Sequence, residues 1–133
     1  MNFNKTTSYS LNILSYMAKN EQNTMSANYL NKKLKIPYSY LRQVLSGLSK
    51  SGFIQSTKGR NGGFIISKDI NSIYLIDVIK STEGMESFDK CIMGFDVCPF
   101  SNPCAMHNLW TNAKAEIINV LKNTSLGDLI KTK

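Results

Sequence analysis

Acidic residues are almost missing from the first half of this chain of 133 residues. Residues 1–66 hold nine lysines and arginines but a single acid, Glu21, so their formal charge is nine minus one, or +8. Residues 67–133 hold seven lysines and arginines and eight acids, a charge of −1. This imbalance argues against a cationic partner for the first half and predicts a polyanion instead.

Long apolar runs are missing as well. No run approaches the roughly 20 apolar residues that cross a bilayer. The opening segment MNFNKTTSYS also lacks the apolar stretch of a secretory signal. Hydrophobic residues still make up 42% of the chain, enough for a core, which argues against a disordered chain. We therefore expect a cytoplasmic protein with one ordinary domain and no membrane partner.

Cysteine is absent outside one short segment, and histidine occurs once. The cysteines are Cys91, Cys98 and Cys104, and His107 lies three residues after the last of them. An odd number of cysteines in a reducing compartment does not form a disulfide framework. Thiolates grouped on one segment suit a soft metal site, either iron–sulfur or zinc.

Both kinds of site need a fourth ligand, and His107 is favoured because one helical turn places its imidazole beside Cys104. The alternative ligands are carboxylates of the same region or, from a partner subunit, a hydroxyl near the N-terminus: Glu83, Glu86, Asp89, Asp96, Ser8 or Tyr9. Three ordinary buried cysteines are a further alternative, since free Cys also behaves as a small hydrophobe. An enzyme or thiol redox protein fits poorly, because the chain has no C-x-x-C pair and no Gly-rich phosphate loop before a helix.

Apolar spacing predicts three helices in the first 52 residues. The first covers residues 7–18, with Thr6 or Thr7 as its cap, and the second lies between Ser26 and Pro37. The third runs from about Ser39 to Gly52. The short turn between the second and third helices is typical of a helix-turn-helix, whose later helix enters the DNA major groove.

The predicted DNA contacts are the outward-facing side chains of these two helices. On the later helix they are Tyr38, Ser39, Tyr40, Arg42 and Gln43, and on the earlier one Lys32, Lys33 and Lys35. A guanidinium at Arg42 predicts a contact with guanine O6 and N7.

A basic hairpin follows the three helices. FIQST (53–57) and FIIS (64–67) have the composition of strands, and KGRNGG between them supplies a turn. Lys58 and Arg60 at its tip can reach phosphates or a minor groove. A plain surface turn is the alternative, but the order helix, turn, helix and hairpin within the basic half predicts a winged helix-turn-helix.

The second half predicts a helix over 72–82, an irregular loop over 84–104 and a long amphipathic helix. The apolar stripe of that helix is Met106, Leu109, Trp110, Ala113, Ile117, Val120 and Leu121. We interpret it as a dimer contact, with ordinary packing within the chain as the alternative. Ser125 and Asp128 have the spacing of a capping box for a last short helix. The expected fold is mainly α with a small β-hairpin, divided into residues 1–82 for DNA binding, 83–104 for the cysteines, and 105–133 for dimerisation.

Several stretches together resemble the Rrf2 family of bacterial regulators over nearly the whole chain. They are YSYLRQVLSGLSKSGFI, KGRNGGFIISKD, INSIYLIDVIKSTEG, the three-cysteine loop, HNLW and NTSLGDLI. The resemblance implies a homodimer on double-stranded operator DNA, with a winged helix-turn-helix in each subunit and crossed long helices.

The resemblance also implies an iron–sulfur cluster near the dimer interface. A His three residues after the last cysteine is similar to family members in which that His is a ligand of a [2Fe–2S] cluster, so Cys91, Cys98, Cys104 and His107 are the expected ligands. A [4Fe–4S] cluster is the alternative. The implied function is a repressor whose operator binding responds to nitric oxide, redox state or iron–sulfur status. A family regulator with a structural zinc or a thiol redox switch is the alternative.

Overall fold

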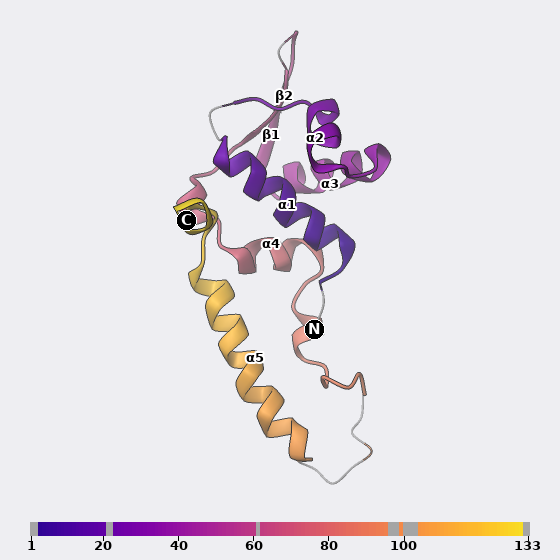
Figure 1. Cartoon of the computed structure of the whole chain (residues 1–133), viewed down its shortest axis with the longest axis vertical. Coiled ribbons are helices and arrows are strands. Elements are labelled where there is room, and N and C mark those ends of the chain that lie inside the picture. Colours follow the sequence, from indigo (N-terminus) through magenta and orange to yellow (C-terminus); the bar gives the residue numbers. More distant parts are fainter. Residues whose placement is uncertain (1–2, 21–22, 61, 96–98, 100–103, 132–133) are drawn as a thin grey trace.

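The computed structural model describes residues 3–20, 23–60, 62–95, 99 and 104–131. Three helices and a hairpin form one end of the molecule, and a long helix extends from the other (Figure 1). In chain order the elements are α1 (Lys5–Lys19), α2 (Ala27–Leu34), α3 (Tyr38–Lys50), β1 (Ile54–Thr57), β2 (Gly63–Ile66), the short 3₁₀ helix η1 (Ile70–Ser72), α4 (Leu75–Thr82), a second 3₁₀ helix η2 (Glu86–Phe88), α5 (Ala105–Asn123) and α6 (Leu126–Lys131).

Helix α1 begins earlier than the sequence predicts. Asn4 caps it, because the Asn4 side chain accepts a hydrogen bond of 2.8 Å from the backbone N–H of Thr7. The predicted cap at Thr6 or Thr7 is therefore wrong. Both threonines lie within the first turn, where their hydroxyls make contacts with other elements instead. For α2 the predicted cap is correct, since Ser26 Oγ accepts from the N–H of Tyr29 at 3.1 Å.

The core lies where the apolar faces of α1, α2 and α3 meet. All four apolar residues predicted for the inner side of α3, Leu41, Val44, Leu45 and Leu48, are buried. Each fully buried side chain of this kind contributes about 1.5–3 kcal/mol through removal from water. This packing fixes which side of α3 faces outward.

The predicted hairpin is present, with β1 and β2 antiparallel and Thr57 opposite Gly63. The connection between α1 and α2 adds a third stretch beside it, because Met25 and Phe64 exchange two backbone hydrogen bonds of 2.9 and 2.7 Å. At Gly63 an added Cβ would lie 2.5 Å from the Met25 carbonyl oxygen, so the close approach requires glycine. The hairpin is thereby tied to the helical core.

Helix α4 begins at Leu75, three residues later than predicted, because residues 70–72 form η1 instead. The chain then returns to this region at its end. The backbone N–H of Leu126 donates to the Ile73 oxygen at 2.9 Å, and that of Leu75 donates to the Thr124 oxygen at 2.9 Å. Leu126 is fully buried in the main core. Helix α6 therefore packs with the N-terminal elements.

The predicted capping box at the start of α6 is confirmed. Asp128 Oδ2 accepts from the Ser125 N–H at 3.0 Å, and Ser125 Oγ accepts from the Asp128 N–H at 3.1 Å. The hydrogen bond from the Ser125 backbone N–H, followed by one from the Ser125 side chain, lowers the pKa of Asp128 below its ordinary value of 3.8.

Helix α5 extends away from the rest of the molecule (Figure 1), and none of its described residues is buried. Leu109 is 64% exposed and Val120 is 59% exposed. Among the described residues, no helix has both the length and the apolar character that crossing a bilayer requires.

Candidate nucleic-acid interface and cysteine loop

The outer side of α3 presents the predicted DNA contacts. Tyr38, Ser39, Arg42 and Gln43 are all exposed, and Tyr38 retains 43% of its surface. Their orientation follows from the apolar side chains of the same helix, which are buried on the inner side. The predicted recognition helix thus has a polar outer face of the kind that direct readout of bases needs.

A tight turn positions α3 relative to α2. Lys35 adopts a left-handed conformation with φ of 56°, and its backbone N–H donates to the Asn31 oxygen at 2.9 Å. The Asn31 side-chain amide then donates to the Ile36 oxygen at 2.6 Å. Ile36 is buried, so both hydrogen bonds and the packing of Ile36 hold the turn in place. The sequence pattern does not show this use of Lys35, because a non-glycine residue in this conformation is uncommon.

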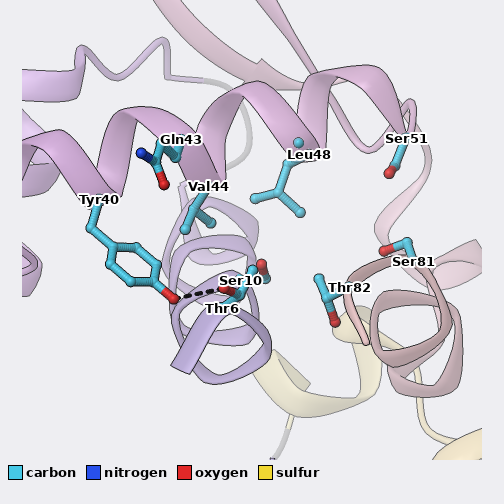
Figure 2. Close-up of a pocket in the computed structure, with 10 residues that line it drawn as sticks. Thr6, Ser10, Tyr40, Gln43, Val44, Leu48, Ser51, Ser81 and Thr82 are labelled. Carbon is cyan, nitrogen blue, oxygen red and sulfur yellow. Dashed lines mark hydrogen bonds between the residues drawn. The ribbon is translucent and has the colours of Figure 1, made fainter. Parts of the chain in front are cut away.

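Tyr40 differs from its neighbours on α3. Its hydroxyl lies 2.6 Å from Thr6 Oγ1, and its ring packs edge-on against Tyr9 with centroids 5.2 Å apart. The side chain is therefore half-buried against α1 (Figure 2), although the sequence predicts an outward-facing residue. Tyr40 fixes the distance between α1 and the predicted recognition helix.

The predicted basic contacts belong to two other elements, α2 and the hairpin. They are Lys32, Lys33 and Lys35 at the end of α2, and Lys58 and Arg60 at the hairpin tip, and all five are exposed. The Lys33 ammonium lies 5.8 Å from the centroid of the Tyr29 ring, a cation–π arrangement. Arg60 also lines a hollow of about 450 Å³ between the hairpin and the α1–α2 connection. The sequence does not predict this proximity, because it depends on the bridge between Met25 and Phe64.

The cysteine loop is described only in part. Cys91 and Cys104 are half-buried, and His107 is exposed in the first turn of α5, where its backbone N–H donates to the Cys104 oxygen at 3.1 Å. The predicted ligand Cys98 and the alternative Asp96 lie outside the described residues. Within the described part of the chain, no three His, Cys, Asp or Glu side chains gather closely enough to hold a metal. The predicted ligand set therefore stays a prediction.

Glu83, one alternative ligand, has structural partners at the start of the loop. Its Oε2 accepts from the Asn4 N–H at 3.0 Å and from the Thr7 hydroxyl at 2.5 Å. Thr7 is fully buried, and its hydroxyl also lies 2.6 Å from Thr82 Oγ1. Glu83 therefore anchors the beginning of the cysteine loop to the beginning of α1. Residues 4–7 and 83 are too far apart in the sequence for any periodic pattern to reveal this contact.

Helix α1 consequently contacts both the loop and the predicted recognition helix. Thr7 bonds to Glu83, and the adjacent Thr6 bonds to Tyr40 on α3. At the other end of the loop, the Trp110 indole N–H donates to the Lys90 oxygen at 3.0 Å. The loop is thus attached to the predicted recognition helix through α1 and to the long helix through Trp110.

Comparison with known proteins extends over the whole chain. Residues 3–132 match the model of the Rrf2 family, described as an iron-dependent transcriptional regulator. An HTH-type transcriptional regulator of Aquifex aeolicus (strain VF5) is 33% identical over 132 residues, covering 98% of this chain and 92% of the relative. The regulator IscR of Klebsiella pneumoniae (strain 342) is 30% identical over 78% of this chain and 63% of its own length.

The fold has solved counterparts. The structure of CymR, the global cysteine regulator of B. subtilis, matches with a TM-score of 0.82 and 25% identity, covering all of this chain and 98% of CymR. Together with the winged helix-turn-helix described above, these similarities settle the family. The chain belongs to the Rrf2 family of transcriptional regulators.

Proposed function

We propose that this regulator is a cytoplasmic repressor that binds operator DNA as a homodimer. The observation that carries the proposal is the common location of its exposed polar and basic side chains. The outer face of α3, the basic end of α2 and the hairpin tip are all exposed, and all belong to the half of charge +8. An exposed polar helix face together with exposed basic side chains on neighbouring elements suits a major groove and its phosphates.

Different residues have different roles in this proposal. Tyr38, Ser39, Arg42 and Gln43 contact bases or nearby phosphates. The basic residues neutralise phosphates and add affinity without sequence preference; they are Lys32, Lys33, Lys35, Lys58 and Arg60. Tyr40 holds α3 at its distance from α1 through the bond to Thr6.

Selection of duplexes from a random pool, followed by fluorescence anisotropy, tests the DNA interface. Arg42→Ala should relax the preference at one base pair, because it removes a bidentate donor. Arg60→Ala should weaken binding to all sequences and reduce the slope of log affinity against log salt by about one. Lys80→Ala, an exposed lysine on α4, is the matched control and should change neither quantity. If Arg42→Ala weakens binding to all sequences equally, Arg42 does not read a base.

The dimer is the second part of the proposal. The apolar stripe of α5 is exposed in the single chain, with Leu109 and Val120 more than half accessible. A second copy of the same helix would cover it, which matches the two-fold symmetry of most helix-turn-helix regulators. We assign residues 1–82 to DNA binding, 83–104 to sensing and 105–133 to dimerisation, with α6 sharing the core of the first segment.

The third part concerns a cofactor. The donor set of Cys91, Cys98, Cys104 and His107 fits an iron–sulfur cluster, [2Fe–2S] or [4Fe–4S], because thiolates with one imidazole are known ligands of such clusters. When bound, such a cluster supplies sensitivity to oxidants, nitric oxide and iron supply. The chain's own part is to link this segment to α3 through Glu83, Thr7, Thr6 and Tyr40.

Iron and sulfide analysis of protein purified without oxygen tests the cofactor. We expect both elements and a brown protein, and we expect Cys98→Ser to lose the visible absorbance. Zinc in place of iron would favour a structural metal, and a colourless, metal-free protein would favour a thiol switch. The thiol switch is the second candidate, because Cys91 and Cys104 are only half-buried and so remain accessible to oxidants.

A further inference from the structure

A pocket of about 250 Å³ lies between α1, α3 and α4, behind the DNA-facing side of α3 (Figure 2). Three elements that are distant in the sequence form its wall. The lining residues are Thr6 and Ser10 of α1, Tyr40, Gln43, Val44, Gly47 and Leu48 of α3, Ser51 after it, and Ser81 and Thr82 of α4. Its volume corresponds to roughly eight molecules of liquid water.

The wall of this pocket is uncharged and combines hydroxyl and amide groups with a larger apolar surface. None of the described residues that line it carries a formal charge, and most carry a hydroxyl or an amide. The hydroxyls of Ser81 and Thr82 both donate to the Val78 carbonyl, at 2.8 and 2.9 Å. Thr82 Oγ1 also lies 2.6 Å from the Thr7 hydroxyl, whereas the Ser81 oxygen can still accept a hydrogen bond from a ligand. Val44 and Leu48 add an apolar part.

Ser10 gives the first sign that the wall is built for a ligand. It is 1% exposed, and among the described residues its Oγ has no hydrogen-bond partner. A buried hydroxyl without a partner is costly and uncommon in folded proteins. A ligand hydroxyl or amide in the pocket would satisfy it.

Gly47 gives the second sign. It lies inside α3, where glycine is less favourable than alanine. No close packing requires it, because an added Cβ would meet no atom of the described residues within 4 Å. The residue also lines the pocket, so the missing side chain preserves its volume.

We propose that this pocket binds a small uncharged metabolite rich in hydroxyl or amide groups, of the size of a pentose or a short polyol. Binding itself is independent of the cysteine loop and of DNA. Its regulatory effect rests on the proposed function: Tyr40 and Gln43 line the pocket and belong to the predicted recognition helix. A bound molecule would therefore alter how α3 is held against α1.

Amide chemical-shift mapping of the full-length protein, with D-ribose as the probe, tests the binding. We expect saturable shifts at the amides of Ser10, Gly47 and Ser81. Succinate, which is charged and of similar size, should cause none, because the wall offers no cation to balance its carboxylates.

Two serines provide a matched pair of variants. Ser10 and Ser49 both have a buried Oγ without a partner among the described residues, but only Ser10 lines the pocket. Ser10→Ala should weaken ribose binding at least fivefold, and Ser49→Ala should leave it unchanged. Gly47→Leu should abolish binding while the protein stays folded, because the added Cβ has room and leucine favours a helix.

Three results would overturn the proposal. The first is the absence of saturable shifts with D-ribose. The second is equal binding by wild type and Gly47→Leu. The third is a loss of self-association in Gly47→Leu without the probe, which would show that a second copy of the chain occupies the pocket. If ribose binds but operator affinity does not change with it, the pocket stands and only its regulatory link to DNA binding fails.

Discussion

The two ends of this molecule differ in how well a single chain buries their apolar side chains. The helical end with its hairpin has a continuous core that includes Ile13, Leu30 and Leu45, each fully buried. Helix α5 has no buried residue among those described, although its apolar stripe is about as regular as that of α1. The contrast indicates that a single chain completes the core of the end proposed to bind DNA but leaves the apolar stripe of α5 uncovered.

The largest expected effect contrasts a core leucine with a leucine of α5. Leu45→Ala should lower the free energy of unfolding by about 2–5 kcal/mol, because it leaves a cavity in a packed core. That loss should be the same at every protein concentration. Leu109→Ala should lower stability only at concentrations where the dimer forms. Urea unfolding at several protein concentrations measures both, and a concentration-independent loss for Leu109→Ala would place it within a single-chain core.

A charge on the exposed stripe tests the dimer directly. Val120→Glu should raise the dimer dissociation constant about a hundredfold, or roughly 2.7 kcal/mol, since a carboxylate would be buried without a partner. Ala115→Glu introduces the same charge on the opposite side of α5 and serves as the control. Analytical ultracentrifugation measures the two constants. Equal constants for both variants would show that the stripe is not the interface.

The contact between the two ends is expected to have a smaller effect. Thr7→Val keeps the shape of the buried side chain but removes the hydroxyl that donates to Glu83. Glu83 keeps its bond to the Asn4 N–H, so we expect a loss of about 1 kcal/mol in urea unfolding. Operator affinity should change as well, because Thr6 next to it holds Tyr40. An unchanged affinity would show that α1 does not link the loop to α3.

The smallest effect concerns the pH dependence at the junction of α5 and α6. Hydrogen bonds from Ser125 lower the pKa of Asp128, so the folded state binds this proton less readily than the unfolded state. The stabilisation is complete above the ordinary value of 3.8 and is lost as the pH falls through the lower folded value. Unfolding of wild type and Asp128→Asn should differ near neutral pH and converge in acid. If the two free energies of unfolding differ by the same amount at every pH, the lowered pKa of Asp128 does not contribute to stability.

Local features of the fold are predictable from the sequence. The buried face of α3, the cap at Ser26 and the capping box of Ser125 and Asp128 all depend on residues within one or two turns of each other. Such patterns reflect helix geometry alone. The hairpin is likewise encoded locally, because its turn residues lie between two short apolar runs.

Contacts between distant segments are not predictable in this way. The bridge from Met25 to Phe64, the return of Leu126 to the core and the anchoring of Glu83 at Thr7 join residues about 40 to 75 positions apart. Tyr40 shows the same limit within the candidate site: its spacing on α3 predicts exposure, but its hydroxyl reaches Thr6. The spacing of residues along α3 gives no information about where α1 packs against it.

The most direct test is the operator affinity of wild type and Cys98→Ser, both purified without oxygen, measured by anisotropy on a duplex selected by the wild type. The account predicts at least a tenfold difference in affinity with the same salt slope, because the basic contacts of α2 and the hairpin are unchanged while the loop that controls α3 is altered. Equal affinities would contradict control of DNA binding by the cysteine loop.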